Sequence, residues 1–156
     1  MSEAEGAARN TEVSFHTLAE AGGSARLRHA CVLAEQAFRA GERVLVWLDG
    51  AEEMARFDDL LWSFGERSFV PHEPLAADPA ACEAPVQLHA GTLPQHVGAA
   101  FGTLLNLREA PCPEALWFGK VIEVVDAEPA CRNAGRARFR WYREQGLTPQ
   151  HVEVKQ

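Results

Sequence analysis

A nearly continuous apolar run at residues 43–48, with a helical pattern on either side, constrains the fold of this chain more than any other feature. A short run of this kind is typical of a strand that is covered on both faces of a sheet. Apolar residues recur at helical spacing over residues 27–38 before it and 54–64 after it. Together with an alternating strand at residues 12–18, this order predicts a parallel sheet with right-handed crossover helices.

Weaker patterns complete the sheet. Residues 22–24, Gly-Gly-Ser, form a turn that offers an N-cap to the first helix. Four prolines within residues 71–85 predict that this segment is mostly loop. Further strands are expected at residues 85–90, 103–107, 121–126 and 151–154, and a third strong helix at about residues 129–145.

Length and composition predict one ordinary globular domain. The chain has 156 residues, of which 47% are hydrophobic and 24% charged, and a chain of this size buries a core of its own. We therefore expect a disordered N-terminal tail at residues 1–10 and a single three-layer, Rossmann-like α/β domain with a mostly parallel sheet at residues 11–156. No apolar run approaches the roughly 18 residues of a membrane span, and we expect a cytoplasmic protein.

The chain offers little for a metal, a cofactor or a nucleic acid to bind. The four cysteines are scattered, with no Cys-x-x-Cys pair and no histidine at zinc-ligand spacing, so we expect reduced thiols and neither metal nor cofactor. The formal net charge of −7 argues against broad binding to a phosphate backbone. We therefore expect no direct sequence-specific contact with nucleic acid.

Two features could still serve an α/β enzyme or a nucleotide-binding domain. Residues 22–24 stand where such folds hold phosphate, but they lack Gly-x-Gly-x-x-Gly and the lysine of a P-loop. Asp49 and Asp126 lie at the ends of predicted strands, yet no positioned histidine, lysine or metal completes an acid–base pair. We predict no catalytic residue, and a nucleotide- or nucleic-acid-binding Rossmann-like domain is the alternative function.

The third helix carries an unusual concentration of arginine. Four arginines fall within a sector of about 80° on a helical projection, namely Arg132, Arg136, Arg140 and Arg143. Phe139 lies beside this sector, and Glu144 is the only acidic residue of the helix. The opposite side is predicted to form the core stripe, with Ala130, Ala134, Ala137 and Trp141. An arginine band with an exposed aromatic residue suits an acidic peptide with an apolar anchor, whereas a solvated helix face or an anion site is the alternative.

A second group of apolar residues follows the second helix. Trp62 points away from that helix's inward stripe, and Phe69, Val70 and Pro71 continue into a loop that could leave apolar surface exposed. Aromatic residues at a rim often anchor an interface. The alternative is that these side chains cover the edge of the core.

These segments resemble a known family. Gly41-Glu42-Arg43-Val44-Leu45, Leu61-Trp62 and Ser68-Phe69-Val70-Pro71-His72 are similar, in this order and at similar separations, to the signature of the chi subunit of bacterial DNA polymerase III. The resemblance extends over residues 11–147 and includes the arginine-rich helix. It implies a Rossmann-like fold without an active site, a 1:1 complex with the psi subunit and, through psi, attachment to the clamp loader. It also implies binding of the acidic C-terminal tail of single-stranded DNA-binding protein, which ends in an apolar Pro-Phe.

The resemblance also assigns residues to these partners. Aligned back from Gly146, the tail-binding positions of the family fall on Arg132, Arg136 and Phe139, to which the band adds Arg140 and Arg143. The far wall of the tail pocket is left open, with Ala127 or Pro129 as candidates. The contact with psi falls on a second set, Trp62, Phe69, Val70, Pro71 and His72.

Overall fold

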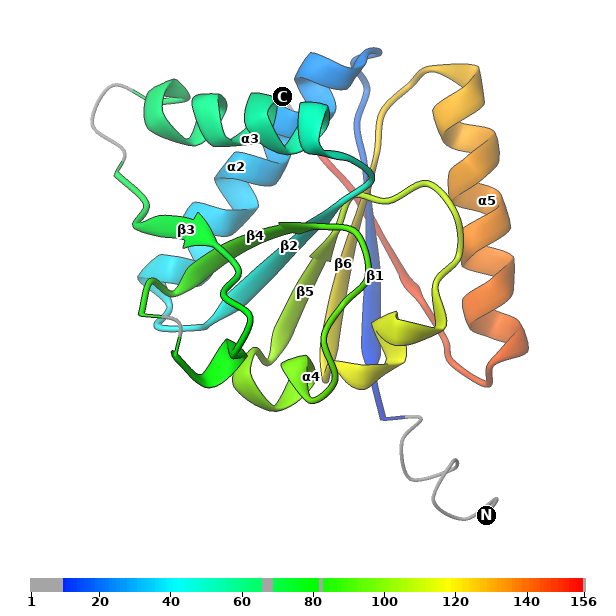
Figure 1. Cartoon of the computed structure of the whole chain (residues 1–156). Coiled ribbons are helices and arrows are strands. Elements are labelled where there is room, and N and C mark those ends of the chain that lie inside the picture. The colour runs from blue at the N-terminus through cyan, green and yellow to red at the C-terminus, as the bar shows by residue number, and fades with distance from the viewer. Residues whose placement is uncertain (1–9, 66–68, 82, 156) are drawn as a thin grey trace.

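The computed structural model describes residues 10–65, 69–81 and 83–155, and within them the chain forms one seven-stranded sheet flanked by helices (Figure 1). The strand order is β3-β4-β2-β5-β6-β1-β7, and every neighbouring pair is parallel. The strands are β1 (Glu12–Thr17), β2 (Val44–Leu48), β3 (His72–Pro74), β4 (Val86–Ala90), β5 (Thr103–Asn106), β6 (Lys120–Val125) and β7 (Gln150–Glu153). The predicted three-layer α/β class is confirmed.

Helices cover both faces of the sheet. They are α2 (Gly23–Arg39), α3 (Ala51–Ser63), α4 (Val97–Ala100) and α5 (Pro129–Glu144), with 3-10 turns η1 (Pro79–Ala81) and η2 (Pro113–Trp117). On one face α2 and α3 pack against Val44, Val46 and Leu48 of β2 (Figure 1). On the other face α4, η2 and α5 pack on the side of the sheet to which Leu45 and Trp47 point. All five residues of β2 are buried, because both layers press on it.

Three expectations concern the loops and the ends of the chain. The segment at residues 71–85 is mostly loop as predicted, and the short strand β3 within it pairs with β4 at the edge of the sheet, where a proline such as Pro74 is tolerated. The turn at residues 22–24 provides the N-cap of α2 through Gly22, at φ 109°, and no side chain caps the helix. Of the predicted tail at residues 1–10, only Asn10 is described, in an exposed turn.

The predicted core stripe of α5 is wrong for Ala130 and Ala137, whereas Ala134 is half-buried and Trp141 is half-buried and packs against the core. Ala130 and Ala137 are exposed, and the buried residues of the helix are Gly135, Arg138 and Tyr142. Gly135 allows the close approach, because a Cβ there would lie 2.8 Å from a methyl carbon of Val125.

Arg138 can be buried because it forms an ion pair with the buried carboxylate of Glu123 on β6. Its Nε donates to Oε1 of Glu123 over 2.8 Å, and one terminal nitrogen donates to the Glu109 carbonyl over 2.9 Å. The second Glu123 oxygen accepts from the Tyr142 hydroxyl over 2.6 Å and from the Asn106 amide over 2.8 Å. Burial beside Glu123 raises the pKa of Tyr142 far above its usual value, so its hydroxyl stays a donor. This buried network fixes α5 on β5 and β6, and turns the other arginines outward.

Candidate partner-binding surfaces

The arginine band consists of Arg132, Arg136, Arg140 and Arg143, and all four side chains are exposed on α5. In the described parts of the chain, none of them forms an ion pair. Arg132 donates to the Leu18 carbonyl over 3.4 Å and Arg136 to the Asn133 side chain over 2.9 Å. The band thus presents four positive charges to solvent on a chain whose formal net charge is −7.

The α5 groove lies between the arginine band and the edge of the sheet. Its volume is about 370 Å³, and it is lined by Phe15, Thr17, Val125, Arg132, Gly135, Arg136, Phe139, His151 and Glu153. Phe139 is half-buried rather than fully exposed, because its ring lies 5.1 Å from that of Phe15, centroid to centroid. The groove therefore has an apolar floor from Phe15 and Phe139 and a cationic side from Arg132 and Arg136.

Strand β7 forms the far wall of the α5 groove, in place of the expected Ala127 or Pro129. It pairs with β1, so that His151 lies beside Phe15 and Glu153 beside Thr17. The Thr17 hydroxyl and the His151 Nε2 are 2.7 Å apart. Alternation along residues 151–154 predicted a strand, but the sequence carries no signal that this strand lies next to β1.

A second hollow continues from the α5 groove along the outer side of the helix. Its volume is about 450 Å³, and it is lined by Arg136, Phe139, Arg140, Arg143 and Glu144. The two hollows share Arg136 and Phe139. The structure thus brings all five residues assigned to the tail-binding site onto one surface.

The aromatic patch, Trp62 and Phe69, lies at the opposite edge of the sheet, near α3 and β3. Trp62 is 59% and Phe69 61% exposed, and their ring centroids are 6.0 Å apart. Pro71 is half-buried, whereas Val70 is 1% exposed and belongs to the core. Of the five residues assigned to the psi contact, Val70 therefore offers no surface in this structure.

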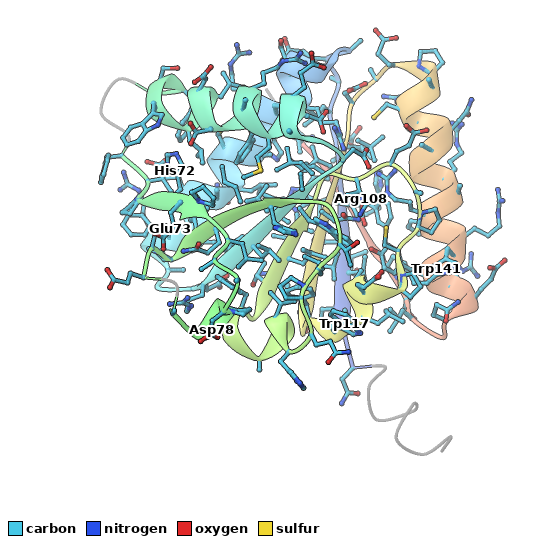
Figure 2. All side chains as sticks on the ribbon, viewed as in Figure 1. His72, Glu73, Asp78, Arg108, Trp117 and Trp141 are labelled. Atoms are coloured by element: carbon cyan, nitrogen blue, oxygen red, sulfur yellow. The ribbon has the colours of Figure 1, made fainter. Side chains whose placement is uncertain are left out.

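His72, on β3 (Figure 2), contacts the aromatic patch through Trp62. Its side chain is 1% exposed, and its ring centroid lies 4.9 Å from that of Trp62. Its Nδ1 is 2.7 Å from the Val70 carbonyl and its Nε2 2.8 Å from the Asp58 carboxylate. Because both groups are acceptors, the ring makes both hydrogen bonds only when each nitrogen carries a hydrogen.

The polar groups at the carboxyl ends of the strands have structural partners. Asp49 accepts hydrogen bonds from Arg108 Nε over 3.2 Å and from the Glu109 backbone over 3.0 Å. Asp126 is buried and accepts from the Glu128 backbone, at the start of α5, over 2.8 Å. These two carboxylates, which the sequence placed where α/β enzymes bind ligands, hold loops in position.

Three further observations concern the described residues. No three histidine, cysteine or acidic side chains among them are grouped as metal ligands would be. None of the described helices has the length and apolar character needed to cross a membrane. Cys31, Cys112 and Cys131 are free thiols, and burial raises the pKa of Cys31 to about 12. Cys82 lies outside the described residues.

Comparison with known proteins identifies the family of the chain. Residues 11–150 match the family described as "DNA polymerase III chi subunit, HolC". The chain is 43% identical over 139 residues to DNA polymerase III subunit chi of Pseudomonas aeruginosa, covering 87% of this chain and 92% of that protein. It is 31% identical over 118 residues to the subunit of the same name from Escherichia coli, covering 75% of this chain and 78% of that protein. The chain therefore belongs to the family of DNA polymerase III chi subunits, which are accessory subunits of the replicative polymerase.

Proposed function

We propose that this chain is a non-catalytic adaptor of the DNA polymerase III holoenzyme in the bacterial cytoplasm. It joins the clamp loader, through the psi subunit, to the acidic C-terminal tail of single-stranded DNA-binding protein. The observation that carries the proposal is the arginine band: four exposed arginines, without acidic partners among the described residues, beside an apolar floor. Such a surface suits an acidic peptide with an apolar end.

The α5 groove accounts for both parts of such a tail. Arg132 and Arg136 hold the terminal carboxylate and nearby acidic side chains, because a guanidinium pairs with a carboxylate through two parallel hydrogen bonds. The final phenyl ring of the tail packs against Phe139 and the aliphatic stem of Arg136. Arg140 and Arg143 extend the positive surface along the second hollow, where further acidic residues of the tail lie.

The aromatic patch is the proposed contact with psi. Trp62 and Phe69 provide large exposed rings, which are the kind of side chain that dominates binding energy at interfaces. Pro71 extends this surface, while His72 and Val70 hold it from beneath. In the proposed 1:1 complex with psi, we assign His72 and Val70 the role of supporting the exposed rings.

The separation of the two surfaces supports an adaptor rather than a competitive switch. The arginine band lies beside β7 and the aromatic patch beside β3, and these strands are the two edges of the sheet. Partners at opposite edges do not overlap, so both can be held together.

A calorimetric titration with the C-terminal peptide of the organism's single-stranded DNA-binding protein tests the proposal. We expect saturable binding that weakens with added salt and is lost in Arg136→Glu. Arg56→Glu is the matched control, because it makes the same charge change at an exposed position of α3.

Failure has a definite meaning in this experiment. If wild type does not bind the peptide at low salt, the tail-binding function is wrong, and the arginine band is then tested against oligonucleotides. If Arg56→Glu loses as much affinity as Arg136→Glu, the binding reflects net charge rather than the α5 groove.

A further inference from the structure

Strand β7 places a carboxylate in a groove that is otherwise cationic. Glu153 lines the α5 groove together with Arg132 and Arg136. It is exposed, and across the described residues it has no ion pair with either arginine. Its negative charge therefore has no ion-pair partner in the part of the chain that the structure describes, and it acts on whatever fills the groove.

The strand register fixes the position of this carboxylate along α5. Glu153 pairs with Thr17, and Thr17 with Val125. Val125 is the residue on which Gly135 packs, so Glu153 lies beside the first half of the helix. Arg143 is about 12 Å further along the helix axis than Gly135, at about 1.5 Å per residue. Glu153 thus faces the end of the groove that holds the terminal carboxylate in the proposed function, on which this inference rests.

We propose that Glu153 is a specificity-determining residue of the α5 groove. It holds the affinity for a carboxylate-terminated acidic peptide below the value that the arginines alone would give. The Glu153 carboxylate and the terminal carboxylate of the peptide carry the same charge and repel each other, and this repulsion destabilises the bound state. The consequence is a faster dissociation of the tail, since affinity changes within one interface fall mainly on the off-rate.

The family match does not assign this role. The matched residues end at Gln150, the first residue of β7, and Glu153 lies three positions beyond. The arginines attract the tail, and Glu153 on β7 lowers the affinity that they would give alone.

The test compares Glu153→Gln with wild type and with Glu52→Gln, which makes the same charge change at an exposed position of α3. Each protein is titrated at low salt with a short acidic peptide ending in Pro-Phe, once with a free terminal carboxylate and once amidated. We expect Glu153→Gln to bind the free-carboxylate peptide about 3- to 10-fold more tightly than wild type. The gain shrinks for the amidated peptide, because the charge nearest Glu153 is gone. Glu52→Gln leaves both affinities unchanged.

The outcomes separate this inference from the proposed function. If wild type binds and Glu153→Gln binds no more tightly than Glu52→Gln, the role of Glu153 is overturned while tail binding stands. If Glu153→Gln gains the same affinity for the free and the amidated peptide, Glu153 does not act on the terminal carboxylate, and that part of the inference is overturned. If neither wild type nor Glu153→Gln binds either peptide, the tail groove falls and this inference falls with it.

Discussion

The two exposed surfaces of this chain are supported in opposite ways. The arginine band stands on a helix that a buried ion pair, Arg138 with Glu123, fixes to the sheet. The aromatic patch is supported by one buried histidine side chain, His72, whose ring contacts Trp62. The band is charged and shallow, whereas the patch is apolar and concentrated in two rings.

This difference predicts how each surface distributes its binding energy. An exposed arginine–carboxylate pair contributes only about 0.2–1 kcal/mol, so the band needs several arginines acting together. A large ring that is buried by a partner contributes about 2 kcal/mol or more, so the patch depends on one or two residues. The band should therefore be sensitive to salt and should tolerate the truncation of one arginine to alanine better than a charge reversal, whereas the patch should be insensitive to salt and should not tolerate the truncation of one ring.

The largest effect is expected at the support of the arginine band. Arg138→Ala leaves the Glu123 carboxylate buried without its cation, and we expect the free energy of unfolding to fall by about 3–5 kcal/mol. Urea denaturation followed by circular dichroism measures this. Arg140→Ala, an exposed change on the same helix, should stay within about 0.5 kcal/mol of wild type. Equal effects of the two changes would show that the buried network does not hold α5.

The next largest effect is expected at the aromatic patch. Trp62→Ala should weaken binding to the psi subunit by about 30-fold or more, because a ring that is desolvated by a partner is lost. Trp117→Ala is the control, since Trp117 is 45% exposed but lies on η2, outside the patch (Figure 2). Surface plasmon resonance with immobilised psi gives both affinities. The assignment of the patch is wrong if Trp117→Ala costs as much as Trp62→Ala, or if Trp62→Ala also abolishes binding of the tail peptide.

Salt provides a third and smaller contrast. Raising the ionic strength from about 0.05 to about 0.5 M shortens the screening length to a few ångströms, and we expect the affinity for the acidic peptide to fall about tenfold. Binding of psi should change by less than about threefold, because the aromatic patch binds mainly through apolar contact. Titrations of both partners over one salt series measure this. A similar salt dependence for the two partners would remove the distinction between the surfaces.

Sequence patterns predicted the parts of this molecule that local spacing encodes. The apolar run of β2 is buried on both faces as predicted, and the arginines of the band share one side of α5 because their spacing follows the helical repeat. The buried side of α5 was not predictable in the same way. Ala137 counts as apolar in any pattern and Arg138 as a surface residue, yet Arg138 is buried because Glu123, a distant residue in sequence, compensates its charge.

The walls of the candidate sites show the same limit. His151 and Glu153 face the α5 groove only because β7 is added beside β1, and strand order is not written in local spacing. The motif at the aromatic patch identified the segment but not which side chains point outward. Phe69 is exposed and Val70, one residue later, is buried. Which of the two is buried depends on how the loop packs against the core, and the motif does not encode this.

The smallest expected effect concerns acid and a pair of histidines at β1, the strand that also carries Phe15 of the α5 groove. His16 on β1 and His29 on α2 have ring centroids 5.6 Å apart. Burial, then the charge of His29 and then that of Lys120, lower the pKa of His16 below its ordinary value of 6.5, and burial lowers the pKa of His29. The folded chain therefore holds both rings neutral, while the unfolded chain takes up protons as the pH falls through about 6.5.

Stability contributed by this pair is thus complete above about pH 7 and declines as the pH falls below about 6.5. We expect wild type to lose more unfolding free energy between about pH 7.5 and about pH 5.5 than His16→Gln does, because the variant has one group fewer to protonate. Urea midpoints at the two pH values measure the difference, and His89→Gln on β4 is the control. Identical losses in wild type and His16→Gln would show that the pair does not titrate on unfolding.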